Sequence, residues 1–492
     1  MMNDYKDSVG KILESIPAIY AKRMKTLPTG YNAEVAIFQN ATAADFEAYC
    51  NAFAEAGYAE YSKTSFCGNP MENGGTESYY KAYFDVNFDD NFNHDNFFAT
   101  YVSDDCSIDI GFHEFDNFLS VAISPCEGLT LPLTSEPAYT PVDSEKYPVI
   151  LTQVGTYSYH PSEIAACHIL RLADGSFIVY DTSFTYFDDR KVAEEIYAVL
   201  RKQAPDPENI VISAIVLSHP HLDHMGGFVE FADLYGADPT ITVKQVVYNF
   251  PDLTVVPNER GAGNSENLHV TNTNAAVKKL GPNVEVVKPR SGNVLCYPGV
   301  KFRVLYTHED FLTLTSNCDG MGNATSLVMQ MVTNDGTTVL FGGDHWTDKT
   351  KGQLKYRYGT FLESFACTLF HHGIGGGAES GLHENCSIYA MAIKPKIVLW
   401  PATWRRMNQT GSTNTLHFSD SAWNRFLTAG KNPGDGAPGT GGFEADKLHD
   451  TPNKNGVYGW FLADDGIQVF TFCGKDRVSV EKYATREAYY NS

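Results

Sequence analysis

The sequence is short of basic residues and has no long hydrophobic run. Its 492 residues include 37 Lys and Arg against 59 Asp and Glu, which gives a formal net charge of −22. A surface of that charge repels phosphate backbones and anionic lipids, and this argues against a general nucleic-acid or membrane binder. No run of about 18 apolar residues is present to span a membrane. The first residues also lack the uninterrupted apolar stretch of a signal peptide, so we expect a cytoplasmic protein.

The ten cysteines include no CxxC pair and are scattered along the chain. Several lie in apolar segments that are typical of strands, as Cys167 does in AACHILRL. This spacing does not favour a disulfide framework. We therefore expect buried, reduced thiols.

The pattern of the sequence changes near residue 146, which predicts two parts. Residues 1–145 combine helical segments, one of them starting at the cap candidate Thr42 and ending at Gly57, with short alternating segments typical of antiparallel strands. In residues 146–492, continuously apolar segments such as ISAIVLS and TTVLFGGD alternate with helical ones. Such segments are typical of strands buried on both faces. We predict an α/β domain with two facing sheets, preceded by an α+β appendage to which no function is assigned.

The segment ISAIVLSHPHLDHMGGF carries the strongest chemical signal. A buried strand is followed by His219, His221, Asp223 and His224, and then by two glycines. Imidazole and carboxylate groups are common zinc ligands. The alternative is a polar loop with chance histidines, but the chain has only 15 His, so three within six residues are improbable by chance. The segment therefore predicts a metal site.

At these residues the sequence resembles the metallo-β-lactamase-fold hydrolase superfamily, whose hallmark is His-x-His-x-Asp-His. The resemblance covers residues 146–492 and implies an αββα sandwich. It also implies three further roles: Asp181 in GSFIVYDTS supports the metal loop, Asp344 in VLFGGDH bridges two metals, and His372 in LFHHGIGGG is a late ligand.

The resemblance implies one more ligand between the hallmark and Asp344, and the candidates are His269 and His308. His308 follows the strand-like segment VKFRVLYT, as the family's layout implies, whereas His269 lies in a polar segment expected to form a loop. We therefore favour His308. The implied ligands are His219, His221 and His308 for one metal and Asp223, His224 and His372 for the other, with Asp344 shared between them.

Asn323 and Ser326 in NATSLVMQM narrow the resemblance to one branch. The pattern is similar to the Asn-x-x-Ser-Leu-Val of phosphorylcholine esterase and of the nuclease domains of DNA uptake. That similarity implies phosphoester hydrolysis at a two-zinc centre. The alternative interpretation of the two residues is a capped turn at the start of a strand.

Two divalent cations held in this way would generate a nucleophile from water. Zinc is the default cation for a His-rich site, and manganese or iron can occupy the same ligands. The cations lower the pKa of a bound water from 15.7 toward about 7. Asp223 and His371 are the candidate catalytic residues. His371 would stabilise developing charge or protonate the leaving group, or else serve only in packing or in a hydrogen bond that supports the ligands. His345, next to Asp344, is assigned no catalytic role.

The function expected from this chemistry is hydrolysis of a phosphodiester or a related small-molecule ester. An acyl hydrolase acting on a lactone, thioester or amide is the alternative, because the same hydroxide attacks either centre. A metal-containing binding or sensing protein is an alternative from another class. Asp344 argues against β-lactam hydrolysis, and His221 favours hydrolysis over the redox chemistry of flavo-diiron enzymes, which have Glu there. The acidic charge disfavours a nucleic-acid substrate, and the sequence predicts no oligomeric state.

Overall fold

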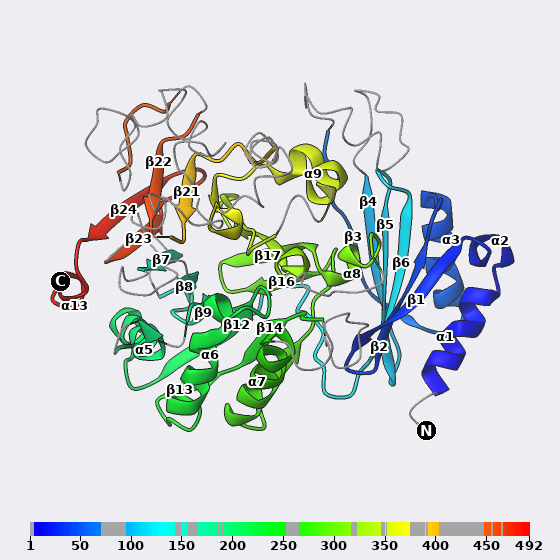
Figure 1. Ribbon diagram of the computed structural model, residues 1–492, viewed down its shortest axis with the longest axis horizontal. Helices are drawn as coiled ribbons and strands as arrows, with labels where there is room; N and C mark the ends of the chain where they lie inside the picture. Colours follow the sequence, from blue (N-terminus) through cyan, green and yellow to red (C-terminus); the bar gives the residue numbers. More distant parts are fainter. Residues whose placement is uncertain are drawn as a thin grey trace.

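A computed structural model of the chain contains three large β-sheets and one two-stranded ribbon, with helices on the outer faces (Figure 1). The ribbon is formed by β10 (Tyr186–Phe187) and β11 (Arg190–Lys191). The structure describes residues 4–69, 95–142, 149–155, 166–184, 186–187, 190–251, 265–315, 322–345, 350, 352–373, 389, 392–402, 447–453, 456–463 and 466–492.

The N-terminal part of the chain forms an antiparallel six-stranded sheet with the order β1-β2-β6-β5-β4-β3. Its strands are β1 (Arg23–Gly30), β2 (Ala33–Phe38), β3 (Ala59–Ser65), β4 (Asn96–Val102), β5 (Cys106–His113) and β6 (Phe118–Pro125). The helices of this part are α1 (Asp4–Glu14), α2 (Pro17–Tyr20) and α3 (Ala43–Glu55). The predicted cap of α3 is confirmed, because Thr42 and Asp45 form a reciprocal capping box.

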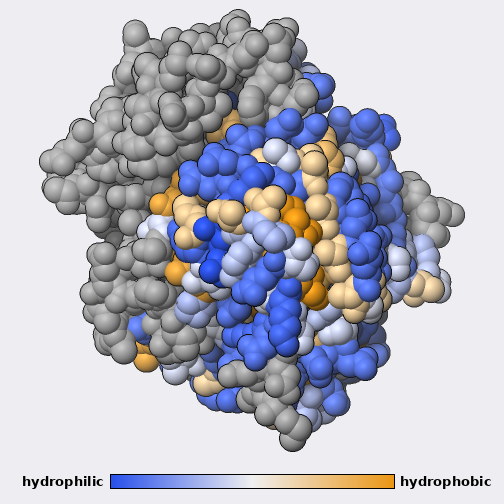
Figure 2. Space-filling view, turned by 90° about the vertical axis from the view of Figure 1, so that its right-hand side faces the viewer, coloured by the Kyte–Doolittle hydropathy of each residue, from blue (hydrophilic) through white to orange (hydrophobic). Residues whose placement is uncertain are grey.

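The inner strands of the six-stranded sheet are buried on both faces, and successive residues of a strand point to opposite sides. In β2, Ala36 and Phe38 pack against the helices, whereas Val35 and Ile37 pack against the C-terminal part of the chain. Seen from the helical side, hydrophilic residues cover most of the coloured surface (Figure 2). The sheet is therefore an inner layer of the molecule, with its helices between it and solvent.

The second sheet is mixed and has the order β15-β14-β12-β9-β8-β7-β23-β24, with β13 paired beside β12. The four strands β9, β12, β14 and β15 run parallel. The strands are β7 (Ile150–Val154), β8 (Cys167–Arg171), β9 (Phe177–Thr182), β12 (Ile210–Leu217), β13 (Ile241–Val243), β14 (Gln245–Tyr248), β15 (Glu285–Val287), β23 (Ile467–Phe472) and β24 (Val478–Tyr483). The helices α5 (Val192–Gln203), α6 (Leu222–Tyr235) and α7 (Ser265–Lys279) cover its outer face, and α13 (Arg486–Tyr490) follows β24.

The third sheet has seven strands in chain order, β16 to β22. They are β16 (Val294–Tyr297), β17 (Val300–Tyr306), β18 (Val328–Thr333), β19 (Thr338–Phe341), β20 (Ala366–Thr368), β21 (Ile397–Trp400) and β22 (Gly459–Leu462). The short helical elements of this region are α8 (His308–Phe311), η1 (Asn323–Thr325), α9 (Gln353–Tyr358), η2 (Gly359–Leu362) and η3 (Phe370–Gly373).

The second and third sheets face each other across one apolar layer. Ala214 and Val216 of the second sheet share this layer with Phe302 and Met329 of the third. The outer face of the third sheet packs against the six-stranded sheet and the short helices. The predicted α/β fold with two facing sheets and an N-terminal α+β segment is therefore confirmed. The boundary predicted at residue 145 falls between β6 and β7, and the division into two domains stays a prediction.

One local expectation was wrong: His269 lies in helix α7 and not in a loop. The buried Val270 and Ala276 pack this helix onto the second sheet despite its polar composition. Five of the eight free cysteines in the described ranges are buried. None of the helices in those ranges combines the length and the apolar composition that a membrane span requires.

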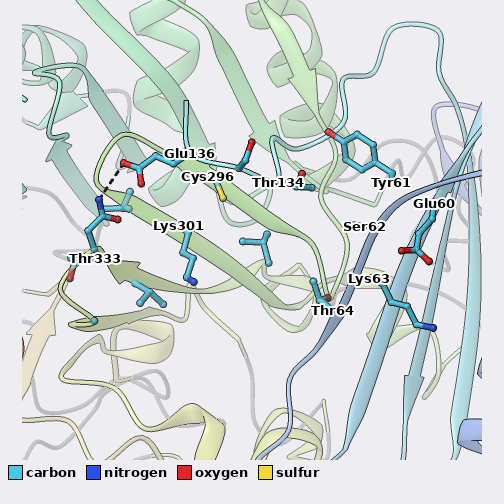
Figure 3. Close-up of a pocket in the computed structure, with 16 residues that line it drawn as sticks. Glu60, Tyr61, Ser62, Lys63, Thr64, Thr134, Glu136, Cys296, Lys301 and Thr333 are labelled. Atoms are coloured by element: carbon cyan, nitrogen blue, oxygen red, sulfur yellow. Dashed lines mark hydrogen bonds between the residues drawn. The ribbon is translucent and has the colours of Figure 1, made fainter. Parts of the chain in front are cut away.

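A groove of about 750 Å³ lies between the edge strand β3 and the edge of the seven-stranded sheet (Figure 3). Glu60 and Lys63 of β3 line one side, and Cys296 and Lys301 line the other. Glu136 accepts a hydrogen bond from Asn334 at one end of the groove, at 3.3 Å. No predicted site residue lines this groove.

Candidate metal centre

The predicted metal loop lies at the carboxyl end of β12. This strand is apolar and flanked on both sides by parallel strands, so it is buried and the chain leaves the sheet at Ser218. His219 is fully buried, and His221 occupies the N-cap position of α6 without a capping hydrogen bond from its side chain. Asp223 and His224 lie in the first turn of that helix. The loop thus directs four potential donors to one end of the sheet.

The second glycine after the hallmark allows α6 to approach β9. A Cβ added at Gly227 would lie only 2.1 Å from the carbonyl oxygen of Thr182. The Thr182 hydroxyl donates to the carbonyl oxygen of His224 at 3.0 Å and accepts from the backbone N–H of Phe228 at 2.9 Å. Helix and strand therefore fix the backbone of His224.

Asp344 and His372 approach the same point from the third sheet, after β19 and β20. His224 Nε2 lies 3.1 Å from Asp344 Oδ1 and 3.2 Å from His372 Nε2. His372 Nε2 lies 3.2 Å from Asp223 Oδ2. One donor atom from each of these four residues lies within 4.8 Å of the others. This first group contains Asp223, His224 and His372, the ligands expected for one metal, together with the shared Asp344.

A second group consists of His219, His221 and Asp344, again with donor atoms within 4.8 Å of one another. Asp344 Oδ2 is 3.7 Å from His219 Nε2, whereas Oδ1 faces His224. The carboxylate of Asp344 therefore presents one oxygen to each group, as a bridging ligand would. Six of the seven predicted ligands come together in these two groups.

His308 joins neither group. Its Nδ1 lies 3.0 Å from the carbonyl oxygen of Asn249 and 3.4 Å from Glu309 Oε2. A capping box of Thr307 and Asp310 starts α8 directly after β17, so His308 is the first residue of a buried helical turn. Its Nε2 is buried and has no hydrogen-bond partner among the described residues, so the role of His308 as the third imidazole beside His219 stays a prediction.

Asp181 holds the metal loop in place. It accepts hydrogen bonds from the backbone N–H and the hydroxyl of Ser218, at 2.7 and 2.8 Å, and lies 2.8 Å from His224 Nδ1. A carboxylate on one ring nitrogen fixes the tautomer and leaves the other nitrogen for a cation. Sequence reasoning did not single out Ser218, whose only signal is its place between a buried strand and His219.

His372 is held by two residues that no local motif indicated. Its Nδ1 lies 2.8 Å from the carbonyl oxygen of Pro401, and the Trp400 indole donates to the carbonyl oxygen of His372 at 2.6 Å. His371 and His372 both adopt left-handed backbone conformations, with φ of 48° and 50°. Such strain clusters at functional sites. Here the backbone N–H of His371 donates to Gly343 at 3.0 Å, which ties this segment to the loop of Asp344.

The buried carboxylates of the centre require positive charge. Burial lowers the pKa of His224, but Asp344 and Asp181 outweigh it and raise that pKa well above its usual value. In the same way, burial lowers the pKa of His372 while Asp344 and Asp223 raise it, with a net result of about 9. A divalent cation would supply this charge in place of protons.

His219 provides the test of whether a metal fits. Burial and the neighbouring His224 keep the pKa of His219 well below its usual value, so the ring is neutral, which is the form that binds metals. Its Nε2 is buried and has no hydrogen-bond partner in the described part of the chain. An orphaned, neutral imidazole nitrogen facing a carboxylate fits a metal ligand.

Of the other residues considered in the sequence, some contact the metal-ligand candidates and one does not. His371 Nε2 lies 4.0 Å from Asp344 Oδ2 and 3.0 Å from Asn323 Nδ2. Ser326 Oγ accepts from the backbone N–H of Asp344 at 3.2 Å. His345 Nε2 instead lies 3.1 Å from the hydroxyls of Tyr389 and Thr350, as expected of a buried structural histidine.

Part of the chain matches the sequence model of a known family. Residues 163–291 match the model of the metallo-beta-lactamase superfamily, which identifies a domain of that superfamily within the chain. The matched segment contains the whole hallmark and Asp181. No match was found among curated proteins.

Three solved structures are similar to the chain at low identity. The metallo-beta-lactamase fold protein YhfI from Bacillus subtilis is 12% identical over 51% of this chain and 85% of its own, with a TM-score of 0.32. A long form RNase Z from yeast is 10% identical over 56% of this chain and 39% of its own, with a TM-score of 0.29. The rubredoxin oxygen:oxidoreductase of Desulfovibrio gigas is 14% identical over 42% of this chain and 41% of its own, with a TM-score of 0.22.

Proposed function

We propose that the chain is a hydrolase that uses two divalent cations sharing Asp344. The observation that carries this proposal is the division of the Asp344 carboxylate, with Oδ1 3.1 Å from His224 Nε2 and Oδ2 3.7 Å from His219 Nε2. A purely structural metal site needs only one closed set of ligands. Two donor groups that share one carboxylate match the arrangement of two-metal hydrolytic centres.

The residues of the chain would divide the work between holding the cations and contacting the substrate. Zinc is the proposed cation because each group contains two imidazoles, and manganese or iron are the alternatives. When bound, the cations would supply hydroxide at neutral pH by lowering the pKa of water. Asp181 and the Pro401 carbonyl would keep the rings of His224 and His372 in the binding orientation.

His371 is the residue proposed to contact the substrate. Burial lowers its pKa to about 4, with a partial offset from Asp344, so its ring is neutral at pH 7. A neutral ring carries no extra proton to give to a leaving group. We therefore propose that His371 hydrogen-bonds to the negative charge that develops on the substrate. Asp223 lies 3.2 Å from His372 Nε2, and its proposed role is that of a metal ligand.

The proposed substrate class is a phosphodiester or related small-molecule ester. It is supported by the NATSLV pattern, whose Asn323 and Ser326 both contact residues of the centre. Acyl hydrolysis of a lactone, thioester or amide is the second candidate, because metal-bound hydroxide attacks a carbonyl carbon as well. We propose a cytoplasmic enzyme acting on small molecules.

The test combines metal analysis with a substrate panel. The full-length chain should contain about two divalent ions and hydrolyse bis-nitrophenyl phosphate faster than lactones or thioesters. His224→Ala or Asp344→Asn should lower the metal content. Either substitution should also lower kcat/KM by at least about 100-fold. His269→Ala is the matched control, since His269 lies in α7 outside both groups, and it should change neither. A chain that binds no divalent metal would overturn the proposal, and faster hydrolysis of acyl substrates would overturn the substrate class.

A further inference from the structure

His308 has one ring nitrogen that is held and one that is left over. Its Nδ1 lies 3.0 Å from the carbonyl oxygen of Asn249, whereas its Nε2 is buried and has no hydrogen-bond partner in the described part of the chain. The candidate ligand His372 is held in the same manner, with its Nδ1 2.8 Å from the carbonyl oxygen of Pro401. A ring fixed at one nitrogen is oriented to offer the other to a cation. The orientation of His308 therefore depends on what holds Asn249 and the turn α8.

Glu309, the second residue of α8, is bound both to Asn249 and to the six-stranded sheet. Its Oε2 accepts a hydrogen bond from Asn249 Nδ2 at 2.7 Å, and the same Nδ2 donates to the carbonyl oxygen of Pro289 at 2.9 Å. Glu309 Oε1 lies 3.4 Å from Nε of the buried Arg290. Nη1 of Arg290 in turn lies 3.2 Å from Oδ2 of Asp109, a residue of β5. One chain of contacts thus runs from the six-stranded sheet to Asn249.

Asp310, the next residue of α8, is bound to the same strand. Its Oδ1 lies 3.2 Å from Nε2 of His113 of β5 and 2.6 Å from the guanidinium of Arg357. Its Oδ2 accepts a hydrogen bond from the backbone N–H of Thr307 at 2.9 Å, as part of the capping box of α8. His113 is buried, and its Nδ1 lies 2.8 Å from the side-chain oxygen of Asn96 of β4. The carboxylate that caps the turn is therefore held by the six-stranded sheet as well.

The hairpin of β1 and β2 supplies two more contacts from the N-terminal part. Nζ of the buried Lys288 donates to the carbonyl oxygen of Thr29 at 2.9 Å. The hydroxyl of Tyr31 lies 2.8 Å from that of Tyr248, the last residue of β14, which directly precedes Asn249. The N-terminal part therefore contacts both segments on which the orientation of His308 depends, the turn α8 and the end of β14.

We infer that the six-stranded sheet positions His308 as the third imidazole of the metal at His219 and His221. The inference rests on the proposed two-metal function, with His308 in the place expected for it. Asp109 and His113 are the positioning residues. They lie four residues apart in β5, so both side chains point to the same face of the sheet, and they act on two consecutive residues of α8. This gives the N-terminal part, to which the sequence assigned no function, a role in metal binding.

Metal titration of the full-length chain tests this inference without any substrate. The metal-free protein is titrated with Zn²⁺ by calorimetry and with Co²⁺ followed by its visible absorption. The parent should bind two ions, and His308→Ala should weaken the binding of one of them. Asp109→Ala and His113→Ala should each weaken the same ion by about 10-fold or more, change the Co²⁺ spectrum in the same direction and leave the other ion unchanged. Asp109→Asn, which keeps the shape of the side chain and removes its charge, should act in the same direction to a smaller extent.

Asp45→Ala is the matched control for a general loss of stability in the N-terminal part. It removes the capping box of α3 and the ion pair with Lys22, on the face of the sheet that packs against the helices and not against α8. Both ions should bind to this variant as they do to the parent, even where urea unfolding shows that it is less stable.

Three results would overturn the inference. One is an equal weakening by Asp45→Ala, because the effect would then follow the stability of the N-terminal part. Another is unchanged binding by the variants of Asp109 and His113. The third is unchanged binding by His308→Ala, which leaves the two-metal proposal in place but removes His308 from it. A parent chain that binds no metal would instead overturn the proposed function.

Discussion

At the scale of single residues, the positions of Asp344, His219 and Gly322 determine the arrangement of the metal-ligand candidates. Asp344 lies where two sheets meet, and its two oxygens face different groups of donors. The neutral ring of His219 has a buried nitrogen without a hydrogen-bond partner among the described residues, as a metal ligand would. Gly322 matters because a side chain there has no room beside His221.

We expect Gly322→Ala to impair metal binding with little loss of global stability. Gly322 has a φ of −46°, which any residue adopts, so the effect is steric and not conformational. The added Cβ, 2.5 Å from His221 Nε2, must displace that ring. Calorimetric Zn²⁺ titration should show weaker binding at one site, while Gly10→Ala, with open space around its Cβ, should bind as the parent does. Unchanged binding by Gly322→Ala would show that His221 does not need its present position.

At the scale of elements, helix α9 and the turn α8 are tied to the N-terminal sheet by a buried ionic network. Arg357 of α9 is fully buried and pairs with Asp116, at 2.7 Å, and with Asp310 of α8, at 2.6 Å. Asp310 in turn lies 3.2 Å from His113 of β5. The appendage therefore fixes the backbone that follows β17, only a few residues from His308.

We expect Asp116→Ala to destabilise the chain by about 3–5 kcal/mol, because it leaves the Arg357 charge buried with one partner fewer. Urea unfolding of the full-length protein measures this change. Glu363→Ala is the matched control: it removes an exposed ion pair with Lys394, and such pairs contribute at most about 1 kcal/mol. Equal effects of the two substitutions would show that the buried network contributes no more than a surface pair.

At the scale of the whole molecule, the six-stranded sheet covers a face of the third sheet that would otherwise meet water. Val35, Ile37, Phe98 and Phe118 of that sheet belong to the same apolar cluster as Val328 of the third sheet. Burying each such side chain is worth about 1.5–3 kcal/mol. The N-terminal part thus takes the place of an outer helical layer over this sheet.

We expect a chain that begins at residue 146 to expose this face. It should bind a hydrophobic dye such as ANS and aggregate at concentrations where the full chain is soluble, because the exposed cluster seeks other apolar surface. Size-exclusion chromatography and dye fluorescence of both chains provide the comparison. A monomeric shortened chain with the thermal midpoint of the full chain would show instead that the two parts fold independently.

The sequence alone determined the features that depend on local pattern. The apolar run of β12 followed by His219, His221, Asp223 and His224 predicted a strand that ends in a metal loop, since both the run and the donors are contiguous. The capped helix α3 was predicted for the same reason. Resemblance to a family added Asp181, Asp344 and His372, which lie far apart along the chain.

Only the tertiary structure decided which distant residues face one another. His308 has the right place in the chain for a ligand, and the capped turn of α8 decides that its Nδ1 faces the Asn249 carbonyl oxygen. Gly322 and Asn323 have no metal-ligand signature, yet the turn ahead of β18 brings Gly322 beside His221 and Asn323 beside His371. The sequence predicts the order of the strands along the chain. The position of a side chain after a strand depends on the turn that follows, and the conformation of that turn depends on packing against the rest of the molecule.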